Sequence, residues 1–329
     1  MKRWRVFLPK KDHSWRRTFQ FLVGLICIFL IVVPIAEGKE GKYPSKPIKV
    51  VVPAGPGGSS DTDVRGMAPY LQKYLGVPII VENVVGARGV VGYNRFYKTK
   101  PDGYSVLFFN LPSPLVHELT KKTEYRTLDY TFIRANTRKS LIFVTPYGKF
   151  NDFKDFVQQA KKTKLKVALT GPSSDLQVYI MGDGLGTELA YIPFEGAARG
   201  LAAVVGGHVD CSVLYVLGCL PLIEAEKISA LLAFTEERDA RIPSVPTAKE
   251  LGYDVKAVPT VSGVVGPPGM PADKVKVIED AIARLPKDPK YMEWANKSGL
   301  VVKSVPAGQF KEIAQGYYEL VKKYKHLFK

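Results

Sequence analysis

A stretch rich in glycine and serine carries the residues best suited to chemistry in this chain, V-V-V-P-A-G-P-G-G-S-S-D at positions 50–61. Its glycines leave main-chain N–H groups unobstructed and allow positive φ, and the serines and aspartate that follow suit a helix N-cap. Amides at a helix N-terminus, aided by the helix dipole, form a small anion site. The pattern indicates binding rather than catalysis, although it also fits a plain tight turn of an α/β fold.

The segments on either side position this turn. Residues 48–52 form a short β-branched run, which is typical of a strand covered on both faces, and a proline ends it. A helix is predicted over 61–74, with Ser59, Ser60 or Asp61 as its cap. A ligand is therefore expected where the first strand meets this helix.

The second half of the chain repeats the arrangement. A predicted strand at 166–169 runs into T-G-P-S-S-D at 170–175, and a helix begins near residue 176. A third loop, at 110–114, follows a predicted strand at 104–109. Loops at the carboxyl ends of parallel strands open on one side of a sheet, where open α/β sheets bind ligands. The protein is thus expected to have two Gly/Ser turns, one in each half.

Strands and helices alternate along the rest of the chain, as in an α/β protein. Its length of 329 residues is enough for two domains. The other predicted strands lie at 77–82, 141–144, 189–193, 208–215, 228–234 and 260–265, and the other predicted helices at 91–98, 153–162, 199–205 and 248–251, followed by three amphipathic C-terminal helices.

The N-terminus has the pattern of a secretory signal. A cationic lead precedes an apolar run at 19–36, and Ala36-Glu37-Gly38 offers a cleavage site before Lys39. The run is also long enough for an uncleaved anchor, so residues 1–38 are predicted to be a signal peptide or an N-terminal anchor. Export through this segment predicts a periplasmic protein.

The formal charge of +16 is unevenly spread. Residues 1–38 hold seven Lys or Arg and two acidic residues, a net of +5, and the other 291 residues carry +11. A basic body favours anionic ligands through its long-range field. The absence of zinc spacing, of an RNA-binding aromatic signature and of a basic helix argues against nucleic acid.

No catalytic motif accompanies the turns. Beyond residue 38 the chain has three histidines, His117, His208 and His326, and none stands in a nucleophile, metal or cofactor pattern. Asp61 and Asp210 are better explained as a helix cap and as a partner for backbone donors than as paired catalytic carboxylates. The sequence predicts a protein that is not an enzyme and has no cofactor and no metal.

Two cysteines, Cys211 and Cys219, lie beyond the predicted signal. Their spacing permits a disulfide in an oxidising compartment. Their apolar neighbours favour buried free thiols instead, and the redox state stays open at this point.

Several motifs occur in the order found in one known family. The run Y-P-S-K-P-I-K-V-V-V-P-A-G-P-G-G-S-S-D is followed by V-E-N-V-V-G-A-R-G and P-D-G-Y-S-V-L. The second half continues with I-P-F-E-G-A-A-R-G-L-A-A-V-V-G-G-H-V-D, V-P-T-A-K-E-L-G-Y and G-P-P-G-M-P. From about residue 43 to its end, the chain resembles the extracytoplasmic solute receptors of tripartite tricarboxylate transporters, also called Bug receptors.

The resemblance implies an α/β fold of the two-lobed periplasmic-binding-protein type II class. Each lobe is expected to be a mostly parallel sheet flanked by helices, and crossing strands join the lobes. Lobe 1 is expected at 44–142 plus 262–329, and lobe 2 at 143–261. The implied function is capture of a small organic acid and its delivery to the membrane permease of a tripartite tricarboxylate-type transporter, by a receptor expected to be a monomer.

The resemblance also implies that main-chain N–H groups of the two turns hold the carboxylate, often through ordered waters. Side chains from further loops would line the remainder of the site and select the tail of the ligand. The predicted ligand-binding residues are Ala54, Gly57, Gly58, Ser59, Ser60, Asp61, Asn110, Ser113, Thr170, Gly171, Ser173, Ser174, Asp175, Phe194, Gly196 and Ala197.

The chain departs from the family pattern at three places. Asp175 stands where relatives commonly carry His, and Val261-Ser262 replaces a frequent aromatic pair. Loss of the aromatic pair suggests a smaller or more aliphatic ligand. Arg199 occupies a position often filled by Pro, where it either contacts a second carboxylate or lies in solvent.

One alternative function remains. Binding-protein folds also serve as periplasmic sensors that dock on a signalling membrane protein, because lobe closure converts occupancy into a surface change. The sequence determines neither the acid bound, nor cleavage of the signal, nor the identity of the permease, nor the choice between transport and sensing.

Overall fold

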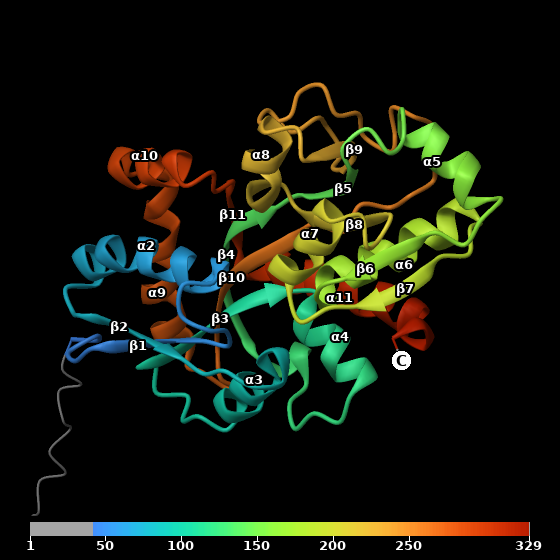
Figure 1. Cartoon of the computed structure of the whole chain (residues 1–329). Helices are drawn as coiled ribbons and strands as arrows, with labels where there is room; N and C mark the ends of the chain where they lie inside the picture. Colours follow the sequence, from blue (N-terminus) through green and yellow to red (C-terminus); the bar gives the residue numbers. More distant parts are fainter. Residues whose placement is uncertain (1–41, 329) are drawn as a thin grey trace, which may run out of the picture. The chain divides into compact units, whose positions relative to one another are not determined.

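Two β-sheets organise the part of the chain that the computed structural model describes, residues 42–328. The first sheet has six strands in the order β11-β4-β10-β3-β1-β2, and the second has five in the order β7-β6-β8-β5-β9 (Figure 1). We call each sheet with its helices the first lobe and the second lobe. The predicted signal or anchor at 1–38 lies outside the described residues.

The strands of the first sheet are β1 (Ile48–Val52), β2 (Ile79–Asn83), β3 (Ser105–Leu111), β4 (Thr131–Lys139), β10 (Thr260–Gly266) and β11 (Val302–Pro306). Those of the second are β5 (Leu141–Pro146), β6 (Lys166–Leu169), β7 (Ala190–Pro193), β8 (Cys211–Tyr215) and β9 (Ile228–Phe234). The α-helices are α2 (Ser59–Leu75), α3 (Val90–Tyr97), α4 (Ser113–Thr120), α5 (Phe153–Ala160), α6 (Pro172–Leu185), α7 (Ala197–Val205), α8 (Val216–Glu224), α9 (Ala272–Arg284), α10 (Pro289–Lys297) and α11 (Ala307–Tyr324).

The sheets are mixed, and the prediction of mostly parallel sheets is wrong. Four strand pairs are parallel, namely β1 with β2, β1 with β3, β6 with β7 and β6 with β8. The other five pairs are antiparallel, and each contains β4, β5 or β10. β5 and β10 each enter a sheet from the other lobe, so they run against the parallel strands of that sheet.

Two connections join the lobes. β4 of the first sheet ends at Lys139 and β5 of the second begins at Leu141, so the backbone crosses within a few residues. The return runs from Phe234 at the end of β9 to Thr260 at the start of β10. Because Leu141 pairs with Phe234, and Thr260 with Lys139, both crossings lie at the facing edges of the sheets.

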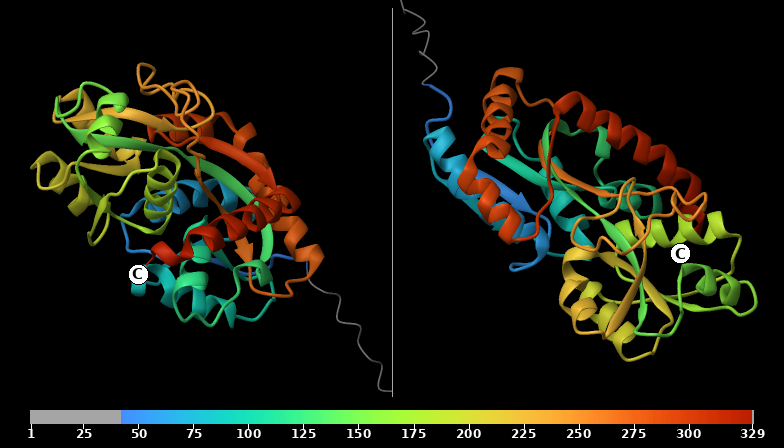
Figure 2. Two further views of the ribbon diagram at one scale, coloured as in Figure 1. Left: turned by 90° about the vertical axis from the view of Figure 1, so that its right-hand side faces the viewer. Right: turned by 90° about the horizontal axis from the view of Figure 1, so that it is seen from above.

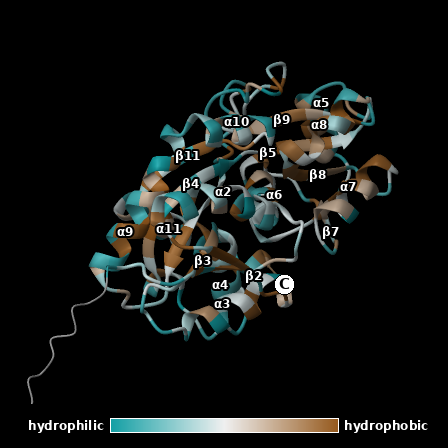
Figure 3. Cartoon of the chain, turned by 90° about the vertical axis from the view of Figure 1, so that its left-hand side faces the viewer, coloured by the Kyte–Doolittle hydropathy of each residue, from teal (hydrophilic) through white to brown (hydrophobic). Residues whose placement is uncertain are grey.

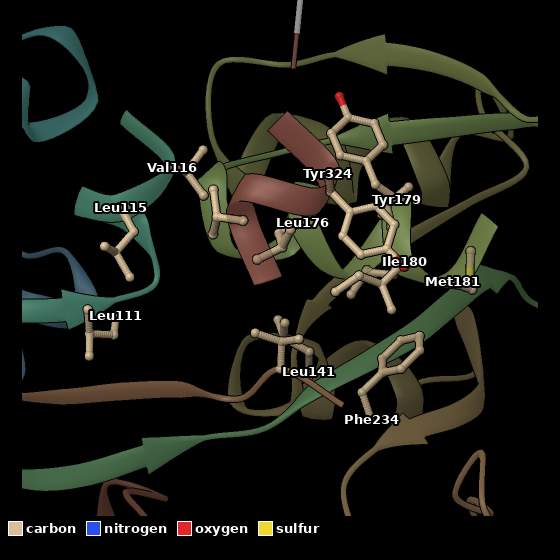
Figure 4. Close-up of a cluster of buried hydrophobic side chains, with 14 of the residues drawn as sticks. Leu111, Leu115, Val116, Leu141, Leu176, Tyr179, Ile180, Met181, Phe234 and Tyr324 are labelled. Atoms are coloured by element: carbon tan, nitrogen blue, oxygen red, sulfur yellow. The ribbon is translucent and has the colours of Figure 1, made fainter. Parts of the chain in front are cut away.

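One apolar core continues across both lobes on the side of α4, α6 and α11. Leu115 and Val116 of α4 and Leu176 of α6 are buried in the same cluster (Figure 4). Tyr324 near the end of α11 belongs to it as well, and Figure 2 shows α11 running from the first sheet toward the second lobe. The helices thus bury apolar area between the lobes, which stabilises their contact.

The hydropathy of the residues differs between the sheets and the outer faces of the helices. The strands are mostly apolar, and the helices that cover them turn their polar faces outward (Figure 3). Within residues 42–328, none of the helices is both long and apolar enough to cross a bilayer.

The structure corrects several predicted elements. Residues 248–251 form hydrogen-bonded turns instead of a helix, and the loop predicted at 110–114 is shortened because α4 begins at Ser113. The sequence interpretation also missed β4, β11 and α8. Cys211 and Cys219 are both buried free thiols, as their apolar neighbours suggested.

Candidate functional site

The first Gly/Ser turn joins β1 to α2 and presents open amides. The helix begins at Ser59, two residues earlier than predicted. Its N-cap is Gly58, which has no side chain to accept hydrogen bonds from the first N–H groups of the helix. Gly57 has a φ of 75°, which suits glycine. Among the described residues, the backbone N–H groups of Ser59, Ser60 and Asp61 have no acceptor. These three donors are free for an anion.

Asp61 supports the turn from behind. Its carboxylate accepts the Gly57 N–H at 2.9 Å and pairs with Arg65 at 2.9 Å, while Asn83 donates to it at 2.9 Å. Hydrogen bonding from Arg65, with help from Gly57 and Asn83, lowers the pKa of Asp61 to about 2. Asp61 therefore fixes the geometry of the turn as an ionised, already partnered group.

The second turn joins β6 to α6 and is tied together by Asp175. One carboxylate oxygen, Oδ1, accepts the N–H groups of Thr170 at 2.8 Å and Gly171 at 3.0 Å. Ser174 Oγ donates to the Gly171 carbonyl at 2.9 Å. The Thr170 and Gly171 amides are thus occupied, and the N–H groups of Ser173 and Ser174 are left without an acceptor among the described residues.

The second turn contacts the first lobe. Ser113 Oγ of α4 lies 2.9 Å from Ser173 Oγ of α6. Arg88, in the loop after β2, donates to the Phe194 carbonyl at 2.9 Å, and its guanidinium lies 4.0 Å from the Asp175 carboxylate. The structure therefore brings the second turn to an interface with α4 and the loop after β2 of the first lobe.

A polar spot beside the first turn combines the predicted residue Asn110 with Ser262, which was not predicted as a site residue. Asn110 Nδ2 donates to Ser60 Oγ at 2.7 Å, and Asn110 pairs in register with Ser262 on β10. Asn110 Oδ1 and Ser262 Oγ are both buried and lack a hydrogen-bond partner among the described residues. Buried polar atoms normally have a hydrogen-bond partner, so these two oxygens are suited to bind a ligand or an ordered water. In the sequence, the position of Ser262 within an otherwise apolar strand was the pattern that could have indicated this site.

The remaining predicted residues lie around this interface. The Ala54 carbonyl accepts from Asn83 at 3.0 Å and so helps shape the turn. Gly196 has a φ of 89° and precedes α7, whose first residue, Ala197, lines a cavity together with Gly57 and Ser59. Arg199 is exposed.

Arg88 sits on a strained loop. It has a φ of 55° and its neighbour Ala87 a φ of 45°, in a region that costs non-glycine residues on the order of 1–3 kcal/mol. His117 Nε2 donates to the Arg88 carbonyl at 3.1 Å from a buried position in α4. Burial lowers the pKa of His117 to about 4, so the ring is neutral at pH 7. The loop is thereby held with the Arg88 side chain toward the second lobe.

Replacing Arg88 with Met should weaken ligand binding about fivefold. The partly exposed Arg88 side chain loses a hydrogen bond to the Phe194 carbonyl and an ion pair with Asp175, together worth about 1 kcal/mol of lobe closure. Isothermal titration calorimetry measures the change. Arg95→Met removes a comparable ion pair with Glu82 inside the first lobe and serves as control. Equal affinities in the Arg88 variant and the wild type would contradict a role in closure.

Asp175 gives stability a specific pH dependence. Burial raises the pKa of its carboxyl to about 6, against the opposing effect of the Gly171 and Thr170 N–H groups. The native state then holds the proton more tightly than the unfolded chain, so this group lowers stability as pH rises from about 4 to about 6. Asp175→Asn keeps an Oδ1 acceptor and should be more stable than wild type at pH 7, by at most about 3 kcal/mol. The gain should vanish near pH 4. Chemical denaturation of both proteins across this range tests it, and a gain independent of pH would contradict it.

The histidines are not gathered at the turns. His117 lies within α4, His208 precedes β8, and His326 lies near the end of the chain. Asp210 accepts the Lys166 N–H at 2.6 Å, which fits its predicted role as a partner for a backbone donor. Among residues 42–328, no group of three or more His, Cys, Asp and Glu side chains is placed to hold a metal ion.

Comparison with known proteins shows the family to which the chain belongs. Residues 64–329 match the sequence pattern of the tripartite tricarboxylate transporter family receptor. The chain belongs to this receptor family. A UPF0065 protein encoded in the gbd 5' region of Cupriavidus necator is 30% identical over 295 residues, which cover 88% of this chain and 89% of that protein. The family resemblance predicted from the sequence motifs is therefore confirmed.

Solved structures of the same kind share the fold. MatC from Rhodopseudomonas palustris, solved with bound malate, is 26% identical with a TM-score of 0.73, and the match covers 85% of this chain and 100% of that one. A TctC solute-binding protein from Polaromonas, solved with no ligand, is 24% identical with a TM-score of 0.74, over 85% of this chain and 98% of that one. The predicted two-lobed binding-protein fold of this receptor is confirmed.

Proposed function

We propose that this receptor captures a small organic acid between its lobes in the periplasm and delivers it to the permease of a tripartite tricarboxylate-type transporter. The observation that carries the proposal is that each lobe has a Gly/Ser turn with open amides, those of Ser59, Ser60 and Asp61 in the first and those of Ser173 and Ser174 in the second. Open amides at helix N-termini bind carboxylates without chemistry. The proposal therefore includes no catalytic step.

Related proteins support the ligand class. MatC, 26% identical over most of its length, binds malate. The unpartnered oxygens of Asn110 and Ser262 add acceptor and donor capacity beside the amides. We further propose that residues 44–142 with 262–329, and residues 143–261, move as the two lobes, and that the receptor is a monomer exported through residues 1–38.

A thermal-shift screen tests the ligand class. Mono-, di- and tricarboxylates, amino acids and matched uncharged analogues are added to the purified protein, because a ligand of the native state raises its melting temperature. Carboxylates are expected to raise it by several degrees and the uncharged analogues to leave it unchanged. No shift with any acid, in protein that is folded and ligand-free, would overturn the proposed function.

A further inference from the structure

A cavity of about 550 Å³ opens beside the first turn, between the lobes. Gly57, Ser59 and Thr62 form its edge at the start of α2, so it adjoins the turn that carries the open amide of Ser59. Lobe-connecting residues and the segment after α10 close it on the first-lobe side, while α7, β8 and α8 close it on the other. Its volume is within the range of small-molecule sites.

Aliphatic and aromatic side chains dominate the lining. They come from both lobes, so the cavity exists only when the lobes are together. The apolar lining residues include Leu201, Leu214, Val216, Leu217, Trp294 and Leu300. A site with this lining favours a ligand that carries apolar surface next to its acid group.

Two cations that line the cavity already have partners. Lys139 lies 2.6 Å from the Asp63 carboxylate. Arg241 is 2.5 Å from Asp239 and donates to the Gly299 carbonyl at 2.7 Å. Neither is free to receive a second carboxylate, since each charge is balanced within the protein.

Arg138 also contributes to the lining, at the end of β4. Its charge acts on the Tyr317 hydroxyl of α11, where it opposes the rise in pKa caused by burial. Unlike Lys139 and Arg241, Arg138 has no ion-pair partner within the described residues, so it is the lining cation that the second carboxylate of a dicarboxylate would meet.

We propose that the ligand is an amphipathic monocarboxylate whose acid group binds the open amides of the Ser59–Asp61 segment and whose apolar tail fills this cavity. The proposal rests on the proposed receptor function and narrows its substrate class. Each methylene that enters the cavity is expected to tighten binding about fourfold, the equivalent of about 0.8 kcal/mol, until the cavity is full. Beyond that length the affinity should fall, because overpacking is destabilising.

The test is a calorimetric series of straight-chain monocarboxylates from acetate to decanoate, each with its uncharged amide, together with dicarboxylates of matched length. We expect Kd to fall with chain length, the amides to bind far more weakly, and the dicarboxylates to bind less tightly than the monocarboxylates. A Kd independent of chain length, or a preference for dicarboxylates, would overturn the aliphatic-tail proposal and leave the receptor function standing. Amides that bind as tightly as acids, or no binding by either, would overturn both.

Two matched variants of α7 locate the tail. Ala198 lines the cavity, and Val205 on the same helix is 40% exposed and does not. Ala198→Phe should fill part of the cavity, so long-chain acids lose at least tenfold in affinity while acetate is unchanged. Val205→Phe should behave as wild type throughout. Equal losses for short and long acids, or a long-chain preference retained in Ala198→Phe, would contradict this placement of the tail.

Discussion

Ser173→Trp is expected to weaken carboxylate binding about 100-fold and to leave each lobe folded. Ser173 is 2% exposed, at the N-terminus of α6, and its hydroxyl lies 2.9 Å from that of Ser113 in the other lobe. An indole at this position cannot fit between the closed lobes and would also cover the open amides. Overpacking of this kind costs about 3 kcal/mol, which corresponds to binding about 100-fold weaker.

Calorimetry with the best acid measures the loss, and circular dichroism establishes the fold. Thr163→Trp places the same side chain at an exposed position of the second lobe, before β6, and should bind as wild type. Gly58→Val tests the first turn, because a Cβ there would meet the Gly55 carbonyl oxygen at 3.2 Å and crowd the neighbouring amides. Affinity retained in both Ser173→Trp and Gly58→Val would refute the assignment of the turns.

Gly263→Val is expected to destabilise the fold by about 3 kcal/mol or more. Gly263 lies in β10 between β3 and β4, next to an irregularity in the pairing with β4. A Cβ at this position would lie 2.4 Å from the Arg134 carbonyl oxygen, 2.5 Å from Ala135 Cα and 2.8 Å from the Phe310 ring. Two of these atoms are backbone atoms in the middle of the sheet and cannot move aside.

Urea denaturation measures the change in the free energy of unfolding. Gly316→Val in α11 is the control, since a Cβ there meets nothing within 4 Å, and its effect should stay within about 1 kcal/mol. A wild-type free energy of unfolding for Gly263→Val would show that β10 has room at this point. Because Ser262 and Asn110 adjoin Gly263, milder substitutions there are also expected to weaken ligand binding.

Much of the candidate site was predictable because it is local in sequence. The strand, glycines, serines and helix of the first turn are contiguous, and the same is true of the second, so both turns were identified from residue types alone. Ser262 and Arg88 were not predicted as site residues, since each reaches the site from a segment distant in sequence. Ser262 joins it through strand pairing with Asn110, and Arg88 through a strained loop held by His117.

The sequence by itself determined the α/β class, the two turns and the receptor family, because each depends on contiguous motifs and their order. The tertiary structure alone decided the rest. It made the sheets mixed, since β5 and β10 each enter a sheet from the other lobe and run against its parallel strands. In the folded protein the N–H groups of Thr170 and Gly171 donate to Asp175, so they are not open for a ligand. The tertiary structure also formed the apolar cavity, whose walls meet only when α7 and α8 approach α2, and no local pattern encodes that approach.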